Sequence, residues 1–296
     1  MQSLFFRLRA GPTRIISVLL LVFLLAGCSA VRLTYNNAPT LTYWWLDGYA
    51  DFDDGQTRLV REQLAALHAW HRANELPAYA ALLTQAQQIA AGTISAPQVC
   101  QLSEQIRQRL FRLSDQSARG LAEVVSALKP AQFSAMREKF DKTNRKWREE
   151  WLDVSPAELA EFRLKKAVER AENFYGRLDE AQIALLRQRI AASAFDPRIA
   201  WAERQRRQQD MLRVLREHAT GAQPAHLQAE MQALLRRNMD SPDPAYRAQF
   251  ERMMTESCQT IADLHHSATP GQRRHLLDRL RGYEGDARVL AGQSKP

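Results

Sequence analysis

The sequence predicts an all-α protein, and three observations lead to that prediction. Glycine and proline number 12 each among 296 residues, whereas enzymes built on parallel sheets generally need more glycine at strand ends and phosphate loops. Apolar residues recur at steps of three and four along most of the chain, and only a helix places such residues on one stripe. Proline stands repeatedly where the first residue of a helix is expected. We therefore expect an array or bundle of roughly nine or ten antiparallel helices joined by short connections.

The chain begins with the pattern of a secretory signal. Arg7, Arg9 and Arg14 precede an apolar run over residues 15–25, which is too short to span a bilayer comfortably as a permanent helix. The run leads into the sequence LAGC, which ends at Cys28 and resembles the bacterial lipobox. That resemblance implies a signal peptide over residues 1–27, diacylglyceryl attachment to Cys28 and acylation of the new amino terminus. The alternative is an ordinary signal peptide with an incidental cysteine.

The residue after the lipobox bears on location. Ser29 stands where an Asp favours retention in the inner membrane, so the resemblance implies sorting to the outer membrane of a Gram-negative bacterium, on its periplasmic side. Membrane lipid is then a partner through acylated Cys28. The formal net charge of +8 is modest and spread among many acids, and this compartment excludes nucleic acid as a partner.

Cysteine usage agrees with export. Once Cys28 carries lipid, Cys100 and Cys258 remain, and two cysteines in an oxidising compartment predict one disulfide between them. The alternative is a pair of buried free thiols.

Residues 28–53 form an aromatic-rich lead-in to a helical periplasmic domain expected over residues 54–296. Five aromatic residues fall between Tyr43 and Phe52, and Trp44 lies close enough to Cys28 for its ring to reach the membrane interface, where Trp and Tyr are enriched. The other interpretation is that the rings pack on the helical domain. We favour packing, because a solvated linker rarely carries so much apolar area.

The domain itself shows successive helical stripes. The clearest runs from Val99 to Leu128, and further stripes run from Phe133 to Trp151, from Leu159 to Leu178 and from Tyr246 to Leu264. Helix starts are marked by proline at Pro130, Pro156, Pro197 and Pro270, and Ser155 with Glu158 predicts a capping box. A strand-like alternation is confined to residues 31–35 and is short.

Three segments of the domain align on a glutamine, at Gln132, Gln182 and Gln272. In each segment a turn precedes the glutamine, and apolar residues follow four and eight positions later. An arginine follows each glutamine, and these three arginines form the candidate binding surface: Arg137, Arg187 and Arg273. Generic helix capping accounts for part of the pattern.

The glutamine-centred pattern resembles the Leu-Thr-x-x-Gln motif of small helical periplasmic proteins that include the Spy-like chaperones. None of the three segments carries both Leu and Thr. The resemblance implies a surface that holds unfolded envelope proteins.

A second resemblance covers nearly the whole chain. The lipobox, YNN at 35–37, WLDGYADF at 45–52, WHR at 70–72 and ELP at 75–77 are together similar to a family of proteobacterial lipoproteins whose domain has no known function. The resemblance implies a location and a helical fold but no activity.

Candidate chemistry is sparse. His68 and His71 lie three apart on one predicted helix and could share a metal, but no further cluster completes a ligand set. The acids at Asp47, Asp51, Asp53 and Asp54 resemble part of a calcium loop, and acids that complement the dipole at a helix start explain them more simply. We therefore expect no metal and no cofactor.

The sequence favours an outer-membrane lipoprotein with a binding or envelope-maintenance role. Spy-like holding of unfolded envelope proteins is one form of that role. The alternative is a helical envelope enzyme or an accessory factor for one, although no catalytic motif such as Gly-x-Ser-x-Gly is present. The oligomeric state is left open.

Overall fold

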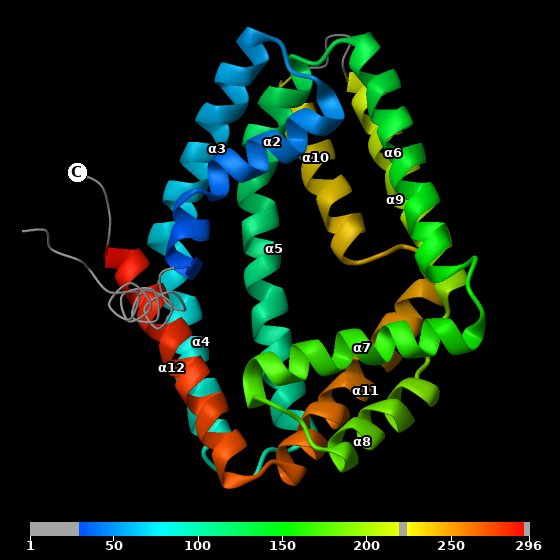
Figure 1. The fold of residues 1–296 in the computed structure, drawn as a ribbon. Coiled ribbons are helices and arrows are strands. Elements are labelled where there is room, and N and C mark those ends of the chain that lie inside the picture. The colour runs from blue at the N-terminus through cyan, green and yellow to red at the C-terminus, as the bar shows by residue number, and fades with distance from the viewer. Residues whose placement is uncertain (1–29, 219–223, 293–296) are drawn as a thin grey trace, which may run out of the picture.

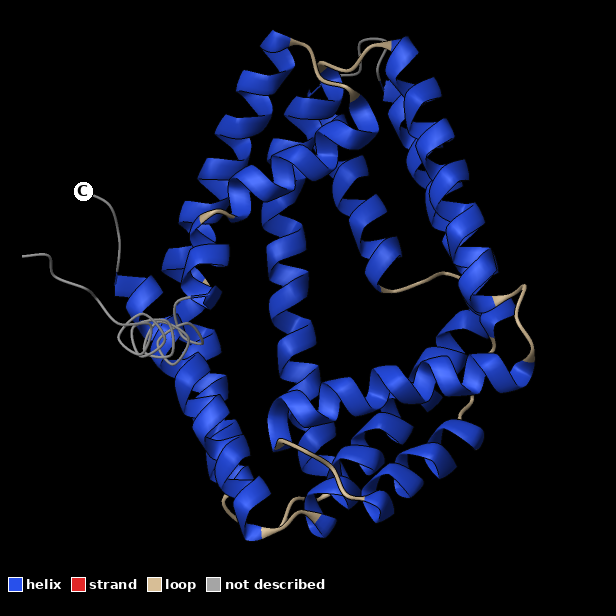
Figure 2. Cartoon of the chain, in the orientation of Figure 1, coloured by secondary structure: helices blue, strands red, loops and turns tan. Residues whose placement is uncertain are grey.

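A computed structural model describes residues 30–218 and 224–292. The predicted signal peptide and Cys28 lie outside these ranges. All regular structure within them is helical, with no strand (Figure 2), which confirms the all-α prediction. Residues 31–35, which alternate like a strand in sequence, lie in a helical segment over residues 30–36. The helices with defined ends are α2 (Ala38–Ala50), α3 (Asp54–Asn74), α4 (Leu76–Ala90), α5 (Ala96–Ser126), α6 (Pro130–Trp151), α7 (Pro156–Tyr175), α8 (Glu180–Ala191), α9 (Pro197–His218), α10 (Pro224–Met239), α11 (Pro244–Ser267) and α12 (Pro270–Gly292).

The prolines begin helices as the sequence predicts. Pro130, Pro156, Pro197 and Pro270 are the first residues of α6, α7, α9 and α12. Proline suits that position because the amide hydrogen that it lacks would have no partner within the helix. The predicted capping box of α7 also forms, with the Ser155 side chain accepting from the Glu158 amide and the Glu158 carboxylate accepting from the Ser155 amide. Local chemistry therefore fixes where these helices start.

The helices are arranged as a frame around the long helix α5 (Figure 1). Helices α3, α4 and α12 form one side, and α6 and α9 form the other. Helix α10 packs along the half of α5 near the top of Figure 1, while α7, α8 and α11 close the bottom. Helix α2 crosses between the two sides and contacts both α3 and α6.

Two apolar cores lie in this frame. The upper core gathers buried side chains of α5, α6, α9 and α10 around Met231 and Val214, which are fully buried. The lower core joins the end of α4 to α7, α8, α11 and α12. Helix α5 contributes Val125 to the upper core and packs Val99 against the lower one, so it ties the two together.

The predicted pair of cysteines meets where α5 crosses α11. Cys100 and Cys258 form a disulfide, with their Cα atoms 5.5 Å apart. The bond joins residues that are 158 positions apart, and closing a loop of that size is worth at most about 5 kcal/mol in the chain-entropy model.

Two helix starts in the upper half are joined by a pair of glutamines, Gln56 and Gln132. We call these two residues the upper glutamine pair. Gln56 and Gln132 each occupy the third position of a helix, and their side-chain amides exchange hydrogen bonds of 3.0 and 2.8 Å. Each side-chain oxygen also accepts from the amide of its own capping residue, Asp53 or Lys129. Each side-chain nitrogen donates to a carbonyl of the helix before the partner, at Ala127 or Ala50.

The same arrangement recurs at the other end as the lower glutamine pair. Gln182 of α8 and Gln272 of α12 exchange hydrogen bonds of 2.9 and 2.8 Å. Gln182 donates to the Ser267 carbonyl at the end of α11, and Gln272 donates to the Arg177 carbonyl just after α7. Each pair therefore joins two helix-to-helix turns that are far apart in the sequence.

The two glutamine pairs show the structural role of the glutamine-centred sequence pattern. Gln132 and Gln182 are buried, and all three predicted glutamines cap their own helices while bonding to another turn. Gln56, which sequence reasoning did not include, completes the set. A buried amide whose donors and acceptors are all used stabilises one relative placement of two turns, because any other placement leaves polar groups unpaired.

We expect Gln132→Ala to lower the free energy of unfolding by about 3 kcal/mol, because it leaves the Gln56 amide and the Ala50 carbonyl without their partner. Gln98 is the matched control: it caps the start of α5 in the same way, is exposed, and its described hydrogen bonds stay within its own turn. Gln98→Ala should cost about 0.5 kcal/mol. Urea unfolding followed by circular dichroism measures both, and equal losses would contradict a cross-linking role for Gln132.

Candidate functional site

An apolar cavity of about 680 Å³ lies in the upper half of the molecule. Six helices line it, represented by Trp45 of α2, Val60 of α3, Leu121 of α5, Phe140 of α6, Met211 of α9 and Met231 of α10. Its walls therefore come from both sides of the frame, and residues of α2 form part of them. Its size and apolar lining are those of a small-molecule site, for which about 300–1,000 Å³ is usual.

The upper glutamine pair borders this cavity. Ala50 and Leu128 line it, and both belong to the turns that Gln56 and Gln132 hold. Asp51, which ends α2, adopts a left-handed backbone with φ of 49°, so the chain turns sharply from α2 into α3. The sharp turn sets the angle between α2 and α3 beside the cavity, and the glutamines fix the end of α2 in that position.

The walls combine close packing with adaptable side chains. At Gly120 of α5 an added Cβ would come within 3.3 Å of the Gln63 Cβ, so α3 and α5 approach closely at this point. Met136, Met211 and Met231 contribute flexible thioethers to the opposite walls. Methionine side chains reshape at low cost, so such a wall can fit apolar molecules of different outline.

A few polar groups border the apolar surface. Gln63 donates to Glu123 over 2.7 Å, and Arg119 forms an ion pair with the same carboxylate at 3.4 Å. On the α10 side, the side-chain oxygen of Asn238 is buried and accepts no hydrogen bond from any described residue. A mostly apolar cavity with a small number of polar groups is the usual chemistry of a site that binds an amphipathic molecule.

Some aromatic side chains of the lead-in pack on the helical domain, and others are exposed. Tyr43 is buried and bonds to Thr57 over 3.0 Å, and Tyr49 packs on Phe140. Trp44 and Trp45 remain 67% and 62% exposed. The prediction that the rings pack on the domain is therefore right for Tyr43 and Tyr49 and wrong for Trp44, whereas Trp45 packs on the Tyr49 ring and lines the cavity but stays largely exposed.

The predicted histidine pair has a structural role in this fold. His71 Nδ1 lies 2.9 Å from the Tyr35 hydroxyl, and His68 Nε2 lies 3.0 Å from the Tyr35 carbonyl. Burial lowers the pKa of both histidines and raises the pKa of Tyr35 to about 12. The two rings thus hold the start of the lead-in against α3.

The acids of the calcium-like segment are used at helix ends. Asp47 accepts from the Phe52 amide, and Asp53 caps α3 and pairs with Lys129, which lowers the pKa of Asp53. Across the described ranges, no three His, Cys, Asp or Glu side chains are grouped closely enough to hold a metal ion.

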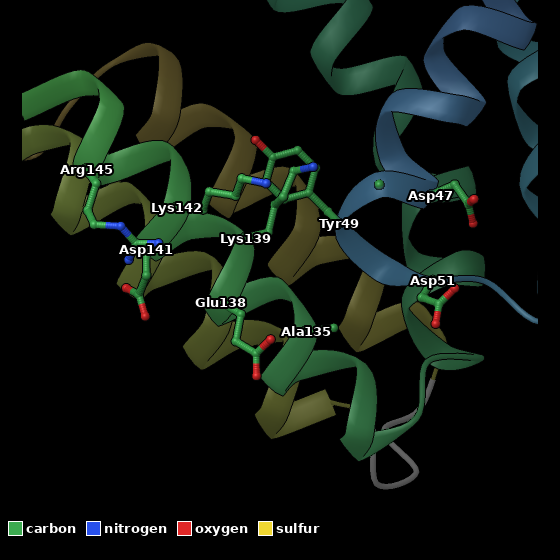
Figure 3. Close-up of a pocket in the computed structure, with 10 residues that line it drawn as sticks. Asp47, Tyr49, Asp51, Ala135, Glu138, Lys139, Asp141, Lys142 and Arg145 are labelled. Atoms are coloured by element: carbon green, nitrogen blue, oxygen red, sulfur yellow. The ribbon is translucent and has the colours of Figure 1, made fainter. Parts of the chain in front are cut away.

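A second, charged groove of about 510 Å³ runs between α2 and α6 (Figure 3). Figure 3 shows Asp47 and Asp51 on the α2 side and Glu138 and Asp141 separated from them on α6. Lys139 lies over the Tyr49 ring at 5.5 Å. Charges of both signs alternate along an open surface, which is typical of a solvated helix face rather than of a catalytic site.

The three predicted arginines lie at two ends of the molecule. Arg137 is exposed on α6, after the upper glutamine pair, whereas Arg187 and Arg273 follow the two glutamines of the lower pair. Arg187 forms an ion pair with Glu161. Arg273 donates to the His265 carbonyl over 3.1 Å and so caps the end of α11. The structure does not bring the three together on one surface.

Comparison with known families gives one match. Residues 48–247 match the model of a family described as a family of unknown function (DUF6279). The chain belongs to this family. The match confirms the predicted kinship with an uncharacterised domain, and the matched region contains all the cavity helices except most of α2. No curated protein and no solved structure matches the chain. None of the described helices is both long and apolar enough to cross a membrane.

Sequence reasoning missed the cavity and Gln56. The signal for Gln56 is present, since Asp53 and Gln56 repeat the capping pattern with Val60 and Leu64 four and eight positions later. The cavity has no such signal, because its lining residues read as ordinary core stripes on six separate helices.

Acidification is expected to destabilise the lower core through His265. This ring is fully buried; its Nε2 donates to the Gly92 carbonyl and its Nδ1 accepts from Tyr175 over 3.1 Å, so it is held neutral. Burial, and then the charge of Arg273, lower its pKa below the ordinary 6.5. The unfolded chain therefore takes up a proton first, and stability is lost as the pH falls below about 6.5.

Urea midpoints measured from about pH 7.5 to about pH 5.5 test this, a window above the range where carboxylates titrate. The midpoint should fall with pH, and His265→Gln should make the decline shallower whatever its absolute stability. An unchanged slope in that variant would show that His265 is not a source of the pH dependence.

Proposed function

We propose that this chain is a lipid-anchored lipoprotein on the periplasmic side of the outer membrane, and that it binds an apolar or amphipathic molecule in the cavity under α2. The anchor and the location come from the lipobox at Cys28 and from Ser29. The binding role is carried by one observation, the 680 Å³ apolar cavity that six helices surround.

The energetics favour such a ligand. Apolar surface removed from water contributes roughly 25 cal/mol per Å², so a chain or ring system buried along these walls would be held mainly by the hydrophobic effect. The walls near Met211 and Met231 can adapt to its outline, and Arg119 and Glu123 lie where a polar end could be placed. Affinity would then depend on length and apolar area more than on a specific polar group.

Two other roles stay predictions. Holding of unfolded envelope proteins would need an exposed adaptable surface, whereas Gln132 and Gln182 are buried and Arg273 is used to cap a helix. A helical envelope enzyme, or an accessory factor for one, would need polar groups converging on a pocket, and the cavity walls here are mainly apolar. The cavity therefore favours binding over both.

A plugged cavity tests the proposal. Ala66 of α3 is exposed and lines the cavity, so Ala66→Trp should place a large ring in it with little effect on the fold. Ala65 is the matched control, because it is also exposed, lies on the same helix and is not among the residues that line the cavity. The probe is the apolar dye Nile red, whose fluorescence rises on transfer out of water.

We expect wild-type protein and Ala65→Trp to bind the dye with the same affinity, and Ala66→Trp to bind it about tenfold more weakly, or not at all. Circular dichroism verifies that both variants keep their helicity. Equal binding by all three proteins, or no binding by the wild type, would exclude the cavity as the site.

A further inference from the structure

The most exposed large apolar side chains in the described part of the chain are concentrated in its first helical turns. Leu33, Leu41, Trp44 and Trp45 are 66%, 54%, 67% and 62% exposed. Leu41, Trp44 and Trp45 are spaced three and four apart on α2, which places them on one face of the helix. Tyr43 and Ala50 point the other way and are buried. We call Leu33, Leu41, Trp44 and Trp45 the outer face of the lead-in.

We propose that the outer face of the lead-in docks on the lipid bilayer, so that α2 lies along the membrane surface. The occupant is argued first from the chain itself. Cys28, the residue predicted to carry lipid, stands two positions before the first described residue, Ala30, and two residues reach at most about 7 Å. The anchor therefore keeps this part of the protein within a short distance of the membrane.

The start of the lead-in is bound to the helical domain, so it is not a flexible linker. Arg32 forms an ion pair with the buried Asp286 of α12 at 2.8 Å. Tyr35 is held by His68 and His71, and Asn36 accepts from Arg72 over 2.7 Å. Because these contacts tie the lead-in to α3 and α12, docking of the outer face would fix the orientation of the whole domain and not only its distance from the bilayer.

The chemistry of the face fits the interfacial region of a bilayer. Tryptophan prefers the level of the headgroups, and a helix with one apolar face and one packed face lies in the plane of the interface.

The face is also continuous with the proposed binding site. Trp45 belongs to the outer face and lines the cavity, and Leu46 lines it beside Trp45. Docking would therefore bring one wall of the cavity to the membrane surface, where apolar and amphipathic molecules are concentrated. This inference relies on the proposed lipid anchor for its geometry, but not on ligand binding in the cavity.

The test uses the full chain purified from membranes and reconstituted into vesicles of phosphatidylcholine and phosphatidylglycerol, with a fraction of the phosphatidylcholine brominated in its acyl chains. Bromine quenches tryptophan fluorescence only at short range. We expect part of the emission to be quenched by the brominated lipid, and that part to be lost in Trp44→Phe with Trp45→Phe. Trp70→Phe is the matched control, because Trp70 lies on α3 and outside the outer face, and it should leave the quenched part unchanged.

The variant Cys28→Ala tests the lipid anchor separately from docking of the outer face. A fall in co-sedimentation with vesicles in that variant reports on the anchor, whereas quenching in the vesicle-bound fraction reports on docking. Equal quenching with and without Trp44 and Trp45 would overturn the proposal. So would strong quenching of these two residues by aqueous acrylamide while the protein is bound to vesicles, or a dimer in which Trp44→Cys crosslinks to its counterpart without any lipid quenching.

Discussion

The upper glutamine pair is the contact on which the arrangement of the upper half depends. The side chains of Gln56 and Gln132 bond to each other, to the capping amides at the starts of α3 and α6, and to carbonyls at the ends of α2 and α5. Four helices that line the cavity are thereby fixed at one point, and because the network leaves no amide group unpaired, shifting any one of them costs hydrogen bonds at the others. The same geometry at Gln182 and Gln272 closes the lower end, so one local device organises both halves.

The proposed function is based on the space that this framework leaves between its helices. A bundle whose helices pack along their whole length would fill its interior, whereas here α2 contacts both α3 and α6 and a cavity of about 680 Å³ remains between the helices. The long helix α5 packs against both cores and so fixes their relative position. The disulfide between Cys100 and Cys258 joins its lower end to α11. The binding role that we propose at a membrane surface would use two features of this framework: the apolar cavity and the outer face of the lead-in.

The sequence predicts helices well where the signal is local. Proline with a capping residue marks the start of α7, and the stripe from Val99 to Leu128 follows α5 closely, because capping and periodicity are properties of neighbouring residues. The partners of Gln132 and Arg273 could not be predicted, because Gln56 lies 76 positions from Gln132 and such a contact leaves no local pattern. The cavity was missed for the same reason, and the two interpretations of the lead-in could not be separated because packed and exposed aromatics alternate around one helix.

The account rests most heavily on the claim that the cavity holds an apolar molecule in the cell. Native mass spectrometry of the protein released gently from its membrane measures this directly. The account predicts a non-covalent mass on the wild-type protein, beyond its covalent lipid, that extracts into organic solvent on denaturation, is retained in Ala65→Trp and is absent from Ala66→Trp. A wild-type protein that carries no such mass, or an equal mass on Ala66→Trp, would contradict it.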